Sequence, residues 1–215
     1  AKTTRYVLSK TNRYDCTTRD TVVVTVHPVP AVEAGKDLVL CPGGSGQLKG
    51  RVTGGTPPFS FRWQPADGLD RSDALATRAA PGRTTTYRLT AIDANGCSAV
   101  DSLIVRVPPP IAMEFDHDPT VCQGAELTLG GTITGGVSPY EVFWSPATGL
   151  SDRKAPTPLL AASASTRYSV TITDANGCQF VDTVRLTVHP APVAMVTVDG
   201  QPEICEGESL RLSAS

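Results

Sequence analysis

The sequence lacks features on which membrane-spanning, nucleic-acid-binding and metal-dependent proteins commonly rely. No apolar run approaches the roughly 20 residues that a membrane-spanning helix needs, so we expect no membrane insertion. The chain has 19 Lys and Arg against 21 Asp and Glu, so no excess of positive charge predicts binding to nucleic acid or to an anionic membrane. Only three histidines are present, and long runs of helix-forming residues are missing.

The abundant residues are those of turns and short strands. The 215 residues include 19 glycines and 18 prolines, together with many Thr, Ser and Val. This composition predicts many short strands joined by turns. The first eight residues resemble the middle of a strand rather than a signal peptide. We therefore expect the sequence to be a piece of a longer protein, cut inside a domain.

One sequence pattern recurs at a fixed distance. The segment Asp93-Ala94-Asn95-Gly96-Cys97 recurs 81 residues later as Asp174-Ala175-Asn176-Gly177-Cys178. The same offset relates Trp63 to Trp144, and Tyr87 to Tyr168. Such a period marks tandem domains. It predicts the C-terminal part of a truncated repeat at residues 1–28, complete repeats at 29–109 and 110–190, and the N-terminal part of a truncated repeat at 191–215.

Proline marks each boundary between repeats. Val26-His27-Pro28, Val107-Pro108-Pro109-Pro110 and Val188-His189-Pro190 occupy corresponding places. Proline-rich joints favour extended, semi-rigid polyproline-II geometry. Short stiff joints between equal domains predict a rod-like array.

The fold class follows from the alternation of side chains inside one repeat. Phe59, Phe61 and Trp63 alternate with polar residues, which is typical of a half-buried antiparallel strand. Asn95-Gly96 lies between two such strands, as in a tight hairpin. About seven short strands in one repeat predict an all-β immunoglobulin-like sandwich, with a fibronectin-like variant as the close alternative. The expected core contains one Trp and one Tyr per repeat, namely Trp63, Tyr87, Trp144 and Tyr168.

Each complete repeat contains two cysteines that are 56 residues apart. Their recurrence in register predicts one disulfide per repeat, Cys41 with Cys97 and Cys122 with Cys178, and an oxidising compartment. Zinc is the competing interpretation, but two cysteines without a nearby His pair do not supply four ligands. Cys16 and Cys205 belong to incomplete repeats, so their partners are expected outside this chain; a direct bond between those two is the alternative.

No group of residues predicts catalysis. His27 and His189 hold equivalent places at the joints, where the middle joint has Pro108, so they are interpreted as joint residues. His117 lies between Asp116 and Asp118, which suggests a solvated acidic turn or, as an alternative, a cation site.

Three aspartates raise the question of calcium. Asp67, Asp70 and Asp73 lack the ligand spacing and closing Glu of an EF-hand loop. We therefore predict no cofactor and no metal, with calcium kept as an alternative, and a protein that is not an enzyme.

Two longer segments resemble a known family. Residues 144–152 (WSPATGLSD) and 166–178 (TRYSVTITDANGC) are similar to the immunoglobulin-like and polycystic-kidney-disease-like repeats of Bacteroidota cell-surface proteins, including gliding-motility adhesins. The family's Trp-Asp-Phe-Gly-Asp-Gly motif is absent. The resemblance implies export across both membranes and a place outside the cell or on its surface, attached to the outer membrane.

The resemblance also implies a modification. O-glycosylation in such proteins follows a rule of Asp, then Ser or Thr, then an aliphatic residue. Asp20-Thr21-Val22, Asp101-Ser102-Leu103 and Asp182-Thr183-Val184 match it at one position of the repeat. Alternation places Thr21, Ser102 and Thr183 outward, where a glycan could attach. The competing interpretation is that each Asp begins a strand and the hydroxyl simply faces water.

These observations predict a non-enzymatic, structural or adhesive segment of a large secreted or cell-surface fibre, acting as a stiff, disulfide-locked stalk. The expected partners are further repeats of the same parent chain or neighbouring copies, which would complete the truncated repeats if filaments form. Surface polysaccharide or another cell is a further candidate partner. The alternative function is a carbohydrate-binding or spacer array attached to a secreted hydrolase, which exposed aromatic residues such as Phe143 and Phe180 would favour.

Overall fold

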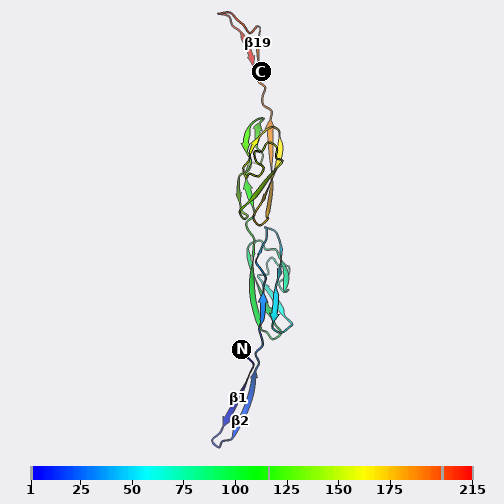
Figure 1. The fold of residues 1–215 in the computed structure, drawn as a ribbon, viewed down its shortest axis with the longest axis vertical. Helices are drawn as coiled ribbons and strands as arrows, with labels where there is room; N and C mark the ends of the chain where they lie inside the picture. Colours follow the sequence, from blue (N-terminus) through cyan, green and yellow to red (C-terminus); the bar gives the residue numbers. More distant parts are fainter. Residues whose placement is uncertain (1, 116, 200, 215) are drawn as a thin grey trace. The chain divides into compact units, whose positions relative to one another are not determined.

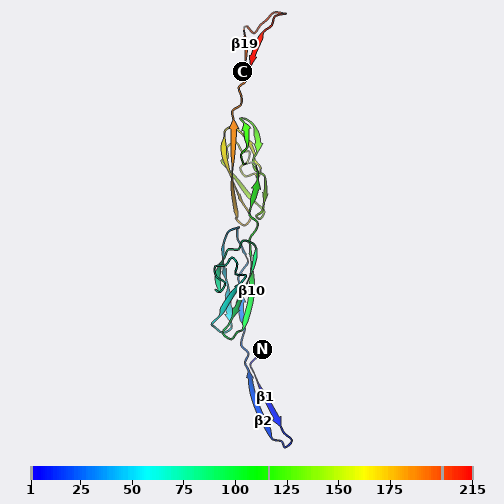
Figure 2. The same ribbon diagram turned by 180° about the vertical axis from the view of Figure 1, so that it is seen from behind.

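The computed structural model describes residues 2–115, 117–199 and 201–214, and its regular structure there is entirely β. The chain divides into two compact units, residues 1–110 and 111–215, which are described separately below. Figure 1 colours the chain from its first residue to its last, and Figure 2 gives the view from behind. The predicted fold class, tandem immunoglobulin-like β-sandwiches, is confirmed.

The first unit begins with a hairpin and continues into one sandwich. Its strands are β1 (Thr4–Thr11), β2 (Thr17–Val24), β3 (Pro30–Glu33), β4 (Leu38–Val39), β5 (Gly46–Lys49), β6 (Arg51–Gly54), β7 (Ser60–Gln64), β8 (Ala76–Ala79), β9 (Thr85–Ile92) and β10 (Ser98–Arg106).

One sheet of this sandwich has the strand order β4-β10-β9-β7, and the opposite side is formed by the pairs β3-β6 and β5-β8. β10 is antiparallel to β9, whereas the short β4 runs parallel to the last residues of β10. Strands β5 and β6 are separated only by Gly50, so one extended segment pairs first with β8 and then with β3. A side chain at Gly50 would collide with Leu89 and Leu75, which explains why glycine occupies this place.

The inward residues of both layers form the core. Trp63, Tyr87, Leu89 and Val105 are fully buried and pack in one cluster. Their positions follow the two-residue alternation of the strands, which turns every second side chain inward. Trp63 also donates a hydrogen bond from Nε1 to the carbonyl oxygen of Ala74, at 2.9 Å, so its polar edge is satisfied inside the core.

The hairpin at residues 4–24 has the same alternation of side chains as the core strands, but its side chains are exposed. β1 and β2 pair with each other over their full length. Tyr6 and Leu8 are 56% and 71% exposed, whereas their equivalents 81 residues later, Tyr87 and Leu89, are fully buried. The hairpin therefore exposes side chains at positions that are buried in the first sandwich.

The second unit repeats this architecture. Its strands are β11 (Ala112–Glu114), β12 (Thr120–Cys122), β13 (Glu126–Thr128), β14 (Thr132–Thr134), β15 (Glu141–Ser145), β16 (Leu159–Ala161), β17 (Thr166–Thr173), β18 (Gln179–His189), β19 (Val196–Asp199) and β20 (Arg211–Ala214).

The strand orders of the second sandwich match those of the first one by one. The four-stranded sheet is β12-β18-β17-β15, and the opposite side is formed by β11-β14 and β13-β16. Trp144 is fully buried and Tyr168 is 2% exposed, so the Trp and Tyr positions are core in both copies. Strands β19 and β20 pair separately with each other.

Candidate functional site

The recurring Asp-Ala-Asn-Gly-Cys segment forms a tight hairpin that the aspartate holds together. Oδ1 of Asp93 accepts hydrogen bonds from the backbone amides of Asn95 and Cys97, both at 2.9 Å. Gly96 has φ +80°, a left-handed conformation that glycine adopts without steric cost. The carboxylate thus replaces, inside the turn, the hydrogen bonds that the sheet provides elsewhere.

The second carboxylate oxygen ties this hairpin to a distant loop. Oδ2 of Asp93 accepts a hydrogen bond from the amide of Thr56 at 3.0 Å, and the carbonyl of Thr56 accepts one from the amide of Ala94 at 2.9 Å. Gly55, which precedes Thr56, has φ +66°, and a Cβ there would lie 3.3 Å from Oδ2 of Asp93. The glycine pair before the Trp strand therefore makes room for this carboxylate.

The electrostatics of Asp93 fit a structural role. Burial raises the pKa of its carboxyl, but hydrogen bonds from the amides of Thr56, Cys97 and Asn95 outweigh burial, and the pKa lies below its usual value. Asp174 repeats the geometry, with Oδ1 accepting from Asn176 and Cys178 and Oδ2 accepting from Val137 at 3.0 Å.

The hairpin formed by β1 and β2 uses a related device. Asn12 is equivalent to Asp93, and its Oδ1 accepts hydrogen bonds from the amides of Tyr14 and Cys16 at 2.9 and 3.1 Å. All three hairpins therefore fix the backbone of a cysteine, at Cys16, Cys97 and Cys178.

The other set of cysteines begins a second recurring turn, which sequence reasoning missed. In Cys41-Pro42-Gly43-Gly44 the amide of Gly44 donates to the carbonyl of Cys41 at 2.8 Å, and Gly43 has φ +75°. The same Cys-x-Gly turn recurs at Cys122 and Cys205, whose carbonyls accept from residues 125 and 208 at 3.1 Å. The signal was present in the sequence as glycine two residues after each of these cysteines.

The predicted pairing of cysteines inside each repeat is wrong. Cys41 and Cys178 are disulfide-bonded, whereas Cys97 and Cys122 are free thiols. The reason is topological: Cys41 follows β4, which pairs with the last residues of β10, whereas Cys97 precedes the first residue of β10. The length of β10 separates them by about 25 Å, far beyond the roughly 7 Å that a disulfide allows between Cα atoms. Cys16 and Cys205 are also free.

The three candidate glycosylation residues lie at exposed positions on equivalent strands. Thr21, Ser102 and Thr183 are exposed on β2, β10 and β18, and the following Leu103 and Val184 are buried. The preceding aspartates also have local roles, because Asp101 Oδ2 accepts a hydrogen bond from the amide of Ala34 at 2.7 Å. The geometry is thus compatible with a glycan and also with the structural interpretation.

The remaining polar candidates take part in local contacts. Nε2 of His117 lies 3.0 Å from Oδ2 of Asp182, and this hydrogen bond lowers the pKa of the Asp182 carboxyl. Asp116 lies outside the described residues. Asp73 forms an exposed ion pair with Arg71 at 3.1 Å, and the carbonyl of Asp67 accepts a hydrogen bond from Tyr87. Within the described ranges, no three His, Cys, Asp or Glu side chains form a metal-binding group.

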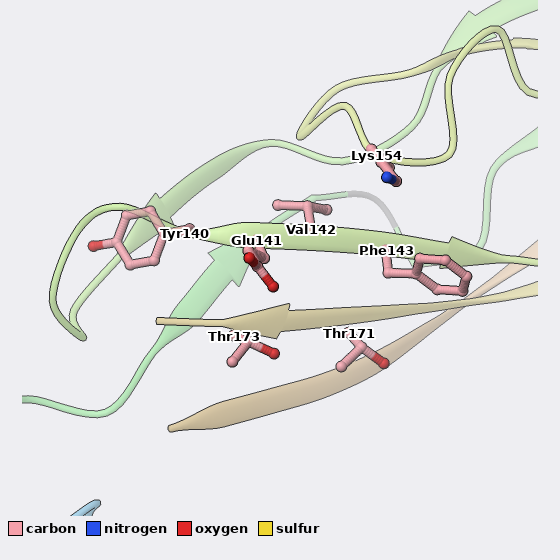
Figure 3. A pocket seen from close by; sticks show the side chains of 7 residues that line it. All are labelled: Tyr140, Glu141, Val142, Phe143, Lys154, Thr171 and Thr173. Carbon is pink, nitrogen blue, oxygen red and sulfur yellow. The ribbon is translucent and has the colours of Figure 1, made fainter. Parts of the chain in front are cut away.

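A shallow groove of about 450 Å³ lies on the outer face of the second sandwich. Figure 3 shows Glu141 and Phe143 from β15 beside Thr171 and Thr173 from β17, with Lys154 on a nearby loop. Phe143 is 39% exposed, and the guanidinium carbon of Arg153 lies 3.9 Å from the centre of its ring. A cation thus occupies one face of the aromatic ring on which a sugar would stack.

The two aromatic residues predicted to mark a binding face do not share a face. Phe143 lies between the buried Val142 and Trp144, so it points outward. Phe180 is two residues before Asp182 and four before the buried Val184, so it lies on the inward side of β18. The position equivalent to Phe143 in the first sandwich is Arg62, so the groove is not a repeated feature.

Comparison with known proteins identifies the fold but no family. No protein-family model and no curated protein matches the chain. An I-band fragment of titin matches with a TM-score of 0.54 and 15% identity, over 88% of each chain. The N-terminal eight Ig domains of Down Syndrome Cell Adhesion Molecule match with a TM-score of 0.55 and 18% identity, over 92% of this chain and 28% of that one.

At these identities the likeness concerns the fold alone. Together with the strand orders, it defines the chain as a tandem immunoglobulin-like β-sandwich protein. Across the described ranges, the structure has no helix that is long and apolar enough to span a membrane.

Proposed function

We propose that this chain is a non-enzymatic stalk segment of a large secreted or cell-surface fibre, with a structural or adhesive role. The observation that carries the proposal is the duplication of the same stabilising devices in both sandwiches. The carboxylates of Asp93 and Asp174 each bind three backbone amides, and Tyr87 and Tyr168 each donate a hydrogen bond of 2.7 Å to a loop carbonyl. The features that recur in both sandwiches are therefore hydrogen bonds that stabilise the fold.

A stalk function needs domains of equal construction that transmit force through folded units. The stiff proline joints, such as Pro108-Pro109-Pro110, suit this role because polyproline segments resist bending over several residues. Export to the cell surface and an adhesive tip elsewhere in the parent protein belong to the same proposal. The partners would be further repeats or neighbouring copies.

Electron microscopy of the native parent protein, on cells and after release from them, tests the proposal. Long beaded or rod-like fibres are expected. A compact particle with a separate globular domain would contradict the stalk and make the repeats accessories of another activity.

The groove at Phe143 supports a second candidate, a carbohydrate-binding module. An exposed aromatic ring beside Glu141, Lys154 and Thr171 offers stacking and hydrogen bonding to a sugar. A binding assay of the purified chain against insoluble polysaccharides tests it. Binding that Phe143→Ala abolishes and Phe180→Ala leaves intact would support this function, and absence of binding by the unmodified chain would exclude it for the polysaccharides used.

A further inference from the structure

Each sandwich exposes a chemically reactive pair of residues at the tip of its recurring hairpin. Asn95-Gly96 lies in the turn between β9 and β10, and Asn176-Gly177 lies in the turn between β17 and β18; all four residues are exposed. An added Cβ would meet nothing within 4 Å at Gly96 or at Gly177. Neither burial nor side-chain packing therefore shields these two turns from water.

Asparagine followed by glycine is prone to a spontaneous rearrangement of the backbone. The backbone nitrogen of the glycine loses its proton and attacks the side-chain carbon Cγ of the asparagine, and ammonia leaves from that carbon. Water then opens the resulting succinimide ring at one of its two carbonyls, which gives aspartate or isoaspartate. Glycine favours the attack because it has no side chain that hinders close approach, and asparagine is a thermally labile residue. Water is the only co-reactant.

In the first sandwich, hydrogen bonds to Asp93 hold the attacking nitrogen away from the asparagine side chain. The amide of Gly96 donates to the backbone carbonyl of Asp93 at 3.0 Å. The amides of Asn95 and Cys97, on either side, donate to Oδ1 of Asp93 at 2.9 Å. Ring closure would turn the Gly96 nitrogen toward the side chain of Asn95 and break its own hydrogen bond. An amide that donates a hydrogen bond is also harder to deprotonate, so the closed turn opposes the reaction twice.

The second sandwich has the same restraint at the same place. The amide of Gly177 donates to the backbone carbonyl of Asp174 at 2.9 Å, and the amides of Asn176 and Cys178 donate to its Oδ1 at 2.8 and 2.9 Å. Both exposed Asn-Gly pairs are therefore held by one aspartate two residues before the asparagine.

We propose that Asn95 and Asn176 are latent sites of succinimide formation, which Asp93 and Asp174 keep unreactive while the hairpins are closed. Opening of a hairpin frees the glycine nitrogen and starts the reaction. Isoaspartate then adds one atom to the backbone and places a new carboxylate beside that of the aspartate. Like charges repel, so the original hydrogen bonds do not re-form and the opened hairpin is permanently marked. This inference concerns the hairpins alone and does not depend on the stalk proposal.

Peptide mapping of the complete 215-residue chain follows both sites at once. The chain is incubated in mildly alkaline buffer, either folded or unfolded in urea, then reduced, alkylated and digested with trypsin. Residues 89–106 contain Asn95 and residues 168–185 contain Asn176, so the two conversions are measured on separate peptides. We expect conversion to be at least about tenfold slower in the folded chain, because the turn must first open. Equal rates in the folded and the unfolded chain would overturn the proposal.

Two matched variants test the part played by the aspartate. Asp93→Ala removes the side-chain acceptor and should speed conversion of Asn95 by about tenfold, while Asn176 in the same molecule keeps its rate. Asp93→Asn keeps an acceptor oxygen, as Asn12 does in the hairpin of β1 and β2, and should leave Asn95 slow to convert. Unchanged conversion of Asn95 in folded Asp93→Ala would overturn the role of the carboxylate.

Hydrogen exchange of the Gly96 amide keeps the test decisive if Asp93→Ala does not fold. In the unmodified chain and in Asp93→Asn, this amide should exchange slowly whenever Asn95 converts slowly, because one hydrogen bond opposes both processes. Rapid exchange of the Gly96 amide beside an intact Asn95, or rapid conversion beside a protected amide, would overturn the proposal.

Discussion

The carboxylate of Asp174 makes a strong prediction for the stability of the second sandwich. Its Oδ1 accepts hydrogen bonds from the amides of Asn176 and Cys178 at 2.8 and 2.9 Å, and its Oδ2 accepts one from the amide of Val137 at 3.0 Å. Asp174→Asn keeps the size of the side chain but replaces one acceptor oxygen by an amide donor. We expect the free energy of unfolding to fall by about 1–3 kcal/mol, because the amide of Val137 then faces a donor.

Denaturant unfolding of the unmodified chain and of Asp174→Asn measures this change. Asp199→Asn, at an exposed position on β19, is the matched control and should leave the denaturant midpoint unchanged. An equal midpoint for Asp174→Asn and the unmodified chain would refute the reasoning.

The remaining predictions concern single positions. Gly136→Ala should cost more stability than Gly124→Ala, because both have positive φ but only the first meets Ile111 and Asp174; equal thermal midpoints would contradict it. The pKa of Asp93 is lowered in the folded state, so its contribution is present above its unfolded pKa and is lost as the pH falls through the folded value. Thermal melts of Asp93→Asn should therefore depend less on pH below about 4 than those of the unmodified chain, and parallel pH profiles would exclude this role. Mass spectrometry of native protein should find glycans on Thr21, Ser102 and Thr183, and unmodified peptides at all three positions would end that hypothesis.

The fold was predictable from the sequence because its signals are local and repeated. The alternation around Phe61 and Trp63 identified a strand, and Asn95-Gly96 identified a hairpin. Because the pattern recurs at an offset of 81 residues, each of these signals occurs at two places in the chain. The split strand at Gly50 was not predictable, because it depends on how closely Leu89 packs across the core.

The candidate site was less predictable because pairing depends on topology. Spacing alone made Cys41 and Cys97 look like partners, and both do belong to one repeat. The parallel pairing of β4 with the last residues of β10 places Cys41 and Cys97 at opposite ends of β10. No local sequence signal predicts a parallel strand of only two residues. Likewise, the role of Asp93 depends on Thr56, which lies 37 residues away in the sequence.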